Sequence, residues 1–330
     1  MGRKKNIIIA EIGSTHDGSL SLAKKSIREA ANSGADAVKF QLHVAEDETL
    51  TNAPSPHYFK NESRYEYFKR TSFNFKEWKQ IANECKKNKV EFICSPFSFK
   101  SVDILEKLKV KKYKIPSGEV TNIPLLKKIS KTGKEILLST GMSSWKEINL
   151  AKKQFKKNKL LIMQCSSEYP CKLKNVGPNL FKDFKKKFIN FGFSDHTLGC
   201  AASSIAASLG ASVIEKHFTL SKKLYGSDAK FSMEPKEFKE FSKIIKEVWF
   251  INKHRVNKNN LKKYASMKKV FEKSVVSNKF LNKGAKIKIK DLNFKKPGNG
   301  IRADKYKKIL GKVLKKNIQI NHKFKYSDFR

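Results

Sequence analysis

Two histidines occur in similar surroundings in the second half of the chain. His196 lies in FSDHTL (193–198) and His217 in IEKHF (214–218), each at the end of an apolar run with an acidic residue close by. Two imidazoles that reach one point can hold a divalent metal and leave open positions for water and substrate, as a catalytic metal site needs. A histidine at the end of a strand is alone more often structural, so the metal prediction depends on whether the fold makes these two neighbours.

Polar side chains also accompany the other apolar runs of the chain. A lysine inside an apolar run is costly unless it meets an anion, and serine hydroxyls can donate to that same anion. Lysines and serines together indicate a ligand with a phosphate and a carboxylate, although a lone lysine could instead extend its ammonium group to the rim of a domain. Glutamates can orient substrate, hold metal-bound water or move protons. The set comprises Glu11, Lys39, Gln41, Ser95, Lys114, Ser117, Glu119, Ser139, Thr140, Ser167, Tyr169, Ser194, Asp195 and Glu215.

The elements that must position these residues alternate regularly. Near-continuous apolar runs are typical of strands buried on both faces of a parallel sheet, and amphipathic segments between them predict helices. Eight such units in about 250 residues favour a (β/α)8 TIM barrel over an open doubly wound sheet, which would usually carry a GxGxxG fingerprint where this chain has AEIGSTHDGS. The predicted strands are 7–12, 36–41, 91–95, 112–116, 135–140, 160–165, 188–193 and 212–217, and the predicted helices are 20–33, 76–88, 99–108, 123–131, 144–155, 177–185, 199–209 and 235–252.

A barrel would bring the whole polar set together. The carboxyl ends of all eight strands meet at one face, which is the catalytic face of TIM-barrel enzymes. His196 and His217 would then follow the neighbouring strands seven and eight, and the pair with its nearby acids favours a metal. His16 and Asp17 can be turn residues or site residues, whereas the remaining histidines are expected at the surface or in packing: His43, His57, His254 and His322.

The sequence changes in character after residue 252. Residues 253–268 are polar and predict a linker, and residues 269–330 contain short strand-like runs broken by NKG and KPGNG. We therefore expect a barrel over 1–252 followed by a small β-rich domain over 269–330.

Composition limits the alternatives. The net charge of +41 would suit a protein that binds nucleic acid or an anionic membrane, but only seven of the 71 basic residues are arginine and the lysines are spread over the whole chain. Such a pattern indicates solvated surface, and an inactive barrel that binds polyanions remains the alternative from another functional class. No apolar run is long enough to span a membrane, the N-terminus lacks a signal-peptide pattern, and five cysteines without a CxxC motif predict reduced thiols in a cytoplasmic protein.

With these residues in view, the chain resembles the sialic acid (N-acetylneuraminate) synthases that use phosphoenolpyruvate. The resemblance covers almost the whole chain and rests on KIPSGEV, LLSTGM, QCSSEYP, GFSDHTLG, VIEKHFTL and GSDAKFSMEP, together with the stretch that begins IIAEIGSTHDGS. The segment LNKGAKIKIKDLNFKKPGNGI resembles the antifreeze-like SAF domain, a β-clip fold, of the same family.

The resemblance implies an activity and a role for each matched residue. It implies that phosphoenolpyruvate condenses with an open-chain acetamido aldose to give a nine-carbon 2-keto-3-deoxy acid and phosphate, in a domain-swapped homodimer. His196 and His217 match ligands of Mn²⁺ or another divalent metal. Glu119 is expected to activate water and Glu215 to orient metal-bound water, and Glu11 completes the catalytic set. Phosphoenolpyruvate would contact Lys39, Ser95, Lys114, Ser117, Ser139, Ser167 and Ser194, and the sugar would face Gln41, Tyr169 and Asp228 as well as Glu11.

Several positions depart from the family pattern and leave the sugar open. Thr15 stands where relatives have Asn, and Ser95 and Ser167 stand where many have Thr and Asn. Lys296 stands where bacterial relatives often have Arg, and Arg302 could substitute for it. N-acetylmannosamine is the default substrate, and a diacetamido-trideoxyhexose that yields a legionaminic- or pseudaminic-type acid is the alternative.

Overall fold

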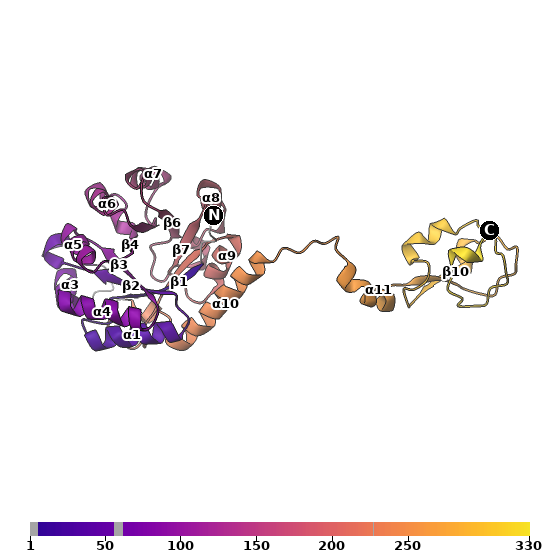
Figure 1. The fold of residues 1–330 in the computed structure, drawn as a ribbon, viewed down its shortest axis with the longest axis horizontal. Coiled ribbons are helices and arrows are strands. Elements are labelled where there is room, and N and C mark those ends of the chain that lie inside the picture. Colours follow the sequence, from indigo (N-terminus) through magenta and orange to yellow (C-terminus); the bar gives the residue numbers. More distant parts are fainter. Residues whose placement is uncertain (1–5, 56–61, 227) are drawn as a thin grey trace. The chain divides into compact units, whose positions relative to one another are not determined.

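The computed structural model describes residues 6–55, 62–226 and 228–330. The chain divides into two compact units, residues 1–254 and 255–330, and each is described by itself (Figure 1). His57 lies outside the described residues.

The first unit contains a closed barrel of eight parallel strands, as predicted, in the order β1 to β8 with β8 pairing back onto β1. One strand, β7, differs clearly from its predicted bounds. It begins three residues later than predicted because Phe188 ends the preceding helix and residues 189–190 form a bend. The strands are β1 (Ile7–Gly13), β2 (Ala37–Leu42), β3 (Glu91–Pro96), β4 (Lys112–Ile115), β5 (Glu135–Ser139), β6 (Leu160–Cys165), β7 (Phe191–Asp195) and β8 (Val213–His217).

The predicted helices surround this barrel (Figure 1). Asn74 caps one of them: its side chain accepts from the Glu77 N–H, and the Glu77 side chain accepts from the Asn74 N–H. Two short helices between β2 and β3, α2 (Ala45–Glu48) and α3 (Arg64–Thr71), were not predicted. The others are α1 (Leu20–Asn32), α4 (Phe75–Lys87), α5 (Phe99–Lys107), α6 (Ile123–Ser130), α7 (Trp145–Gln154), α8 (Pro178–Lys187), α9 (Ala201–Leu209) and α10 (Pro235–Lys253).

The interior of the barrel changes from apolar to polar along its strands. Inward-facing side chains alternate along a strand, and the first inward positions form a separate apolar cluster that includes Ile9, Ala37 and Val213. Two residues further along the same strands, the inward positions are Glu11, Lys39 and Glu215. The apolar layer therefore closes the lower barrel, and the charged groups collect at the carboxyl ends of the strands.

The second unit is a small domain with a core of its own. Strands β9 (Ser274–Ser277) and β10 (Leu292–Lys295) pair antiparallel, and isolated bridges such as Leu281 to Ile318 connect the other extended segments. Buried apolar side chains including Leu314 and Phe324 fill its centre. Helix α11 (Ala265–Phe271) begins inside the segment predicted as a linker.

Within the part of the chain that the structure describes, no helix combines the length and the apolar character needed to cross a membrane.

Candidate active site

A pocket of about 790 Å³ lies at the carboxyl ends of the barrel strands, and the residues that the family resemblance assigns to the site line it with one exception. They are Glu11, Lys39, Gln41, Lys114, Ser117, Glu119, Ser139, Ser167, Tyr169, Ser194, His196, Glu215, His217 and Asp228.

Ser95 is the exception. It is fully buried and does not line the pocket, whereas the Lys39 Nζ lies 3.4 Å from its Oγ. Its hydroxyl therefore contacts Lys39 in this structure. Its predicted contact with the substrate anion stays a prediction.

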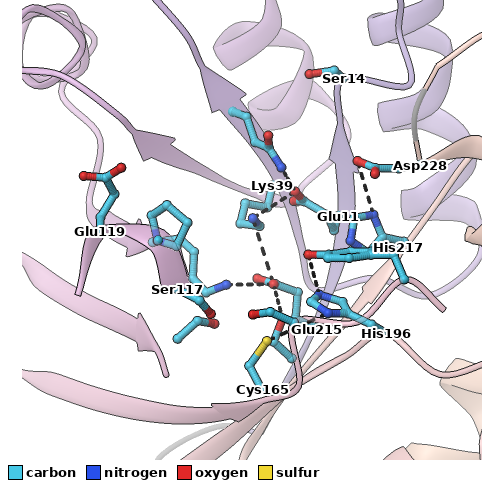
Figure 2. A pocket seen from close by; sticks show the side chains of 18 of the residues that line it. Glu11, Ser14, Lys39, Ser117, Glu119, Cys165, His196, Glu215, His217 and Asp228 are labelled. Atoms are coloured by element: carbon cyan, nitrogen blue, oxygen red, sulfur yellow. Dashed lines mark hydrogen bonds and ion pairs between the residues drawn. The ribbon is translucent and has the colours of Figure 1, made fainter. Parts of the chain in front are cut away.

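Two carboxylates and two ammonium groups form one buried cluster at the base of the pocket (Figure 2). The Lys114 Nζ lies 2.7 Å from the Glu215 Oε1, and the Lys39 Nζ lies 2.9 Å from the Glu11 Oε1 and 3.9 Å from the Glu215 Oε1. Ser194 donates to the same Glu215 oxygen at 2.8 Å. Buried charges are tolerated when they are paired and hydrogen-bonded in this way.

The cluster shifts the acidity of its members. Burial raises the pKa of Glu215, but Lys114 and Lys39 outweigh it and lower that pKa to about 2. Burial lowers the pKa of Lys114, whereas the carboxylates of Glu11 and Glu215 more than offset burial at Lys39 and raise its pKa. Burial raises the pKa of Glu11. Within the described residues, the Oε2 atoms of Glu11 and Glu215 are buried without a hydrogen-bond partner, so each can accept from a ligand.

Serine hydroxyls surround the lysines on the neighbouring strands. The Ser139 Oγ is buried and has no hydrogen-bond partner in the described chain, and the Gly141 N–H donates to the Ser117 Oγ at 3.0 Å. A Cβ at Gly141 would lie 2.2 Å from the Ser167 Oγ and 2.9 Å from the Ser117 Oγ. Gly141 is thus a site residue that the sequence did not single out, because only a residue without a side chain lets these serines converge.

The two histidines lie together, as their neighbouring strands require. Their ring centroids are 5.4 Å apart, and the Tyr169 ring stacks on His196 with its hydroxyl 3.2 Å from the Nε2. The His217 Nδ1 is buried without a hydrogen-bond partner among the described residues, and its closest acidic neighbour is the Asp228 Oδ2 at 3.9 Å. Burial lowers the pKa of His217 well below its ordinary value, so the ring keeps the lone pair that a metal would bind.

These features fit a metal site with two protein ligands. No group of three or more His, Cys, Asp or Glu side chains within the described ranges is arranged to hold an ion. His196 and His217 would supply two ligands, and water and substrate would supply the others.

A second buried ion pair lies behind the histidines. Asp195 and Lys216 pair in register on β7 and β8, and the Lys216 Nζ lies 3.0 Å from the Asp195 Oδ2. Asp195 also accepts from the Ser203 hydroxyl and the Thr197 N–H. Each member of the pair directly precedes a histidine, so the pair fixes the two strand ends that carry the imidazoles.

The comparisons agree with this geometry. The NeuB family model matches residues 26–257, and the SAF domain model matches residues 272–330. The chain belongs to the NeuB family.

Named relatives of this NeuB-family chain are sugar-acid synthases. An N,N'-diacetyllegionaminic acid synthase of Campylobacter jejuni is 39% identical, with 96% of this chain and 98% of the relative covered. An N-acetylneuraminate-9-phosphate synthase of Drosophila melanogaster is 30% identical over 94% of this chain and 92% of its own length. The crystal structure of a sialic acid synthetase from Leptospira borgpetersenii, in complex with citrate, superposes with a TM-score of 0.72 at 29% identity and covers 81% of this chain and 92% of that one.

Glu119 lies apart from the charged cluster of this NeuB-family site (Figure 2). It belongs to a short 3-10 turn after β4, and the Asn122 Nδ2 donates to its Oε2 at 2.7 Å. Burial raises the pKa of its carboxyl group. Glu119 lines the pocket, and its assignment as the group that activates water stays a prediction.

The wall of the pocket next to Gln41 contains residues that the sequence did not assign to the site. His43 lines the pocket and stacks between the rings of Phe68 and Phe97, at centroid distances of 3.7 Å and 4.2 Å. The prediction that His43 is a packing or surface residue is therefore incomplete. Helix α3 supplies Arg64 and Phe68 to this wall, and its short, weakly periodic sequence gave no signal for a site element.

Proposed function

We propose that this protein condenses phosphoenolpyruvate with an open-chain acetamido aldose to form a nine-carbon 2-keto-3-deoxy acid and phosphate. The observation that carries the proposal is the convergence of two buried lysines, several serine hydroxyls and two imidazoles on one pocket. Lysines and serines suit the phosphate and carboxylate of one reactant, and the two imidazoles suit a metal beside the other reactant. Membership of the NeuB family supports the same reaction.

Lys39, Lys114 and the serines would act on phosphoenolpyruvate throughout the reaction. Their positive charges and hydroxyl donors hold the phosphate while carbon 3 of phosphoenolpyruvate attacks the aldehyde carbon, water adds at carbon 2, and the C–O bond to phosphate breaks. Because these groups are already ordered by the buried carboxylates, little reorganisation is needed when charge develops.

The acidic residues and histidines would act at the aldehyde and at the added water. A divalent cation such as Mn²⁺, held by His196 and His217, would supply the charge that polarises the aldehyde oxygen. The raised pKa of Glu119 suits a group that takes up a proton from water. The Oε2 of Glu215, which has no hydrogen-bond partner among the described residues, would orient a water molecule.

We propose a diacetamido-trideoxyhexose, giving a legionaminic-type acid, as the aldose. The relative at 39% identity carries that product in its name. The pocket lining includes the apolar side chains of Phe68, Phe97 and Met142, and such side chains suit the methyl group that a 6-deoxy sugar has in place of a hydroxymethyl group. N-acetylmannosamine is the second candidate, favoured by the names of the sialic acid synthetase from Leptospira and of the synthase from Drosophila.

A substrate panel tests both the proposed reaction and the proposed sugar. Purified protein loaded with Mn²⁺ is given phosphoenolpyruvate and either N-acetylmannosamine, a diacetamido-trideoxyhexose or no sugar, and released phosphate is measured. We expect release that depends on both metal and sugar, with the highest kcat/KM for the diacetamido sugar. A preference for N-acetylmannosamine would overturn the choice of sugar. If neither acetamido aldose of the panel causes phosphate release, the reaction itself is refuted.

We also propose that the enzyme is a cytoplasmic, domain-swapped homodimer, as family membership suggests. Helix α11 fits this proposal because Met267, Val270 and Phe271 are all more than half exposed. Light scattering coupled to size exclusion should give the mass of two chains, and a monomer at micromolar concentration would contradict the proposal.

A further inference from the structure

A continuous chain of hydrogen bonds leads from helix α2 into the pocket. The Glu48 Oε1 lies 2.6 Å from the His43 Nδ1, the His43 Nε2 lies 3.1 Å from the Gln41 Oε1, and the Gln41 Nε2 lies 2.7 Å from the Glu11 Oε1. The side chains of both His43 and Glu48 are only 4% exposed. Neither of these two residues belongs to the site that the sequence predicts.

His43 is held firmly at the centre of this chain. Its ring is nearly parallel to that of Phe68, with an angle of 9° between the planes, and Phe97 covers the other face. The Ser72 hydroxyl donates to the His43 carbonyl oxygen at 3.1 Å. The second oxygen of Glu48 accepts from the Val44 N–H at 3.3 Å. The ring therefore has little freedom to turn.

The chemistry of the groups gives each bond a direction. The Glu11 and Glu48 carboxylates can only accept, so the Gln41 amide nitrogen donates to Glu11 and the His43 Nδ1 donates to Glu48. The Gln41 carbonyl oxygen then faces the His43 Nε2 and accepts from it when that nitrogen carries a proton. If the amide turned over, its oxygen would meet the Glu11 carboxylate. Glu11 and His43 together hold this orientation of the Gln41 amide.

One donor and one acceptor remain for a ligand at this point of the pocket. The Gln41 amide nitrogen has two N–H groups and uses one on Glu11, and the Glu11 Oε2 has no hydrogen-bond partner within the described residues. A hydroxyl group can accept from such an N–H while it donates to such an oxygen. Both residues line the pocket.

We propose that Glu48 and His43 are positioning residues for recognition of the aldose: they hold the Gln41 amide so that Gln41 and Glu11 present this donor and acceptor to one sugar hydroxyl. The proposal rests on the proposed function, because the aldose is the reactant assigned to this wall. Lys39 joins this chain through the Glu11 Oε1, so KM for phosphoenolpyruvate should change less than KM for the aldose.

Two substitutions of one residue separate hydrogen bonding from packing. His43→Phe keeps a ring between Phe68 and Phe97 but removes both ring nitrogens, whereas His43→Gln removes the ring and keeps an N–H that can reach the Gln41 oxygen. We expect His43→Phe to raise KM for the aldose about tenfold or more, which corresponds to about 1.4 kcal/mol, with KM for phosphoenolpyruvate changed less than twofold. His43→Gln should have the smaller effect on KM for the aldose, and Glu48→Gln should shift it in the same direction as His43→Phe.

The opposite ranking would overturn the proposal. If His43 only packs, His43→Phe retains the wild-type KM for the aldose and His43→Gln is the damaging change; equal rises in both KM values would likewise show a general disturbance of the pocket. A Gln41→Met background provides the matched control, since His43→Phe should then have no further effect on KM. Wild-type turnover is measured first: its absence with every aldose refutes the proposed function, whereas normal turnover with an unchanged His43→Phe variant refutes only the positioning role. Thermal unfolding verifies that each variant is folded.

Discussion

Replacement of Lys114 by methionine tests whether the charged cluster at the base of the pocket is a balanced unit. Lys114 is 2% exposed, and its ammonium group lies 2.7 Å from the Glu215 Oε1. Methionine has a similar length and an apolar stem, so Lys114→Met removes a charge with little loss of packing. Glu215 then keeps the Ser194 hydroxyl at 2.8 Å and Lys39 at 3.9 Å as its polar contacts.

The expected cost follows from leaving a carboxylate buried with weaker compensation. Removal of one partner of a buried ion pair costs about 3–5 kcal/mol of unfolding free energy. Because Lys39 still faces Glu215, we expect the lower end, about 3 kcal/mol. The double variant Lys114→Met with Glu215→Gln should be more stable than Lys114→Met alone, since it removes the uncompensated charge and keeps an acceptor for Ser194.

Urea unfolding followed by tryptophan fluorescence measures this effect in the barrel alone. The three tryptophans, Trp78, Trp145 and Trp249, all lie in the first unit. Lys128→Met is the matched control: Lys128 pairs with Asp103 at 2.7 Å on the surface, where such pairs contribute about 0–1 kcal/mol. If Lys114→Met is no more destabilising than Lys128→Met, or if the double variant is less stable than the single one, the cluster is not the balanced unit described above.

Three further predictions concern the metal, the anion and the second unit. His217→Ala should abolish Mn²⁺ binding, measured by calorimetry without substrates, and abolish turnover while the circular dichroism spectrum is unchanged; retained binding would remove His217 from the metal site. Gly141→Ala should raise KM for phosphoenolpyruvate about tenfold or more and leave KM for the aldose nearly unchanged, because the new Cβ would displace the Ser117 and Ser167 hydroxyls; unchanged KM values would contradict it. Burial raises the pKa of Asp328, but hydrogen bonds from His322 and the Lys325 N–H outweigh it and lower that pKa. The stability that Asp328 contributes is therefore present above its unfolded pKa of about 3.9 and is lost as the pH falls below it; calorimetry should show that Asp328→Asn lowers stability at neutral pH and flattens this acid dependence, and an unchanged profile would refute the assignment.

The barrel and most of its site could be predicted because two patterns agree along the chain. Near-continuous apolar runs mark the strands, and amphipathic helices separate the strands at regular intervals. Side chains at alternate positions of a strand lie on opposite faces, so the position in the strand predicts whether a side chain faces the barrel interior. The distance of a residue from the carboxyl end of its strand predicts how close it lies to the catalytic face. These two rules are sufficient to bring the lysines, serines and histidines together.

The features that were missed depend on contacts that no periodicity encodes. Ser95 has the same inward-facing position in its strand as its neighbours, but the contact of its hydroxyl with Lys39 depends on side-chain length and depth. Gly141 matters because two serines from other strands approach it. Helices α2 and α3 are too short for a strong amphipathic signal, and they complete the wall around His43.

The most direct test of the central claim is mass spectrometry of both products after reaction of a diacetamido-trideoxyhexose with phosphoenolpyruvate whose bridging oxygen is isotopically labelled. We predict a keto acid with the summed mass of the aldose and pyruvic acid, formed in equal amount to phosphate, with the label in the phosphate because the C–O bond breaks. Recovery of the label in a carbon-containing product, or release of phosphate without a condensed acid, would contradict the reaction proposed for this site.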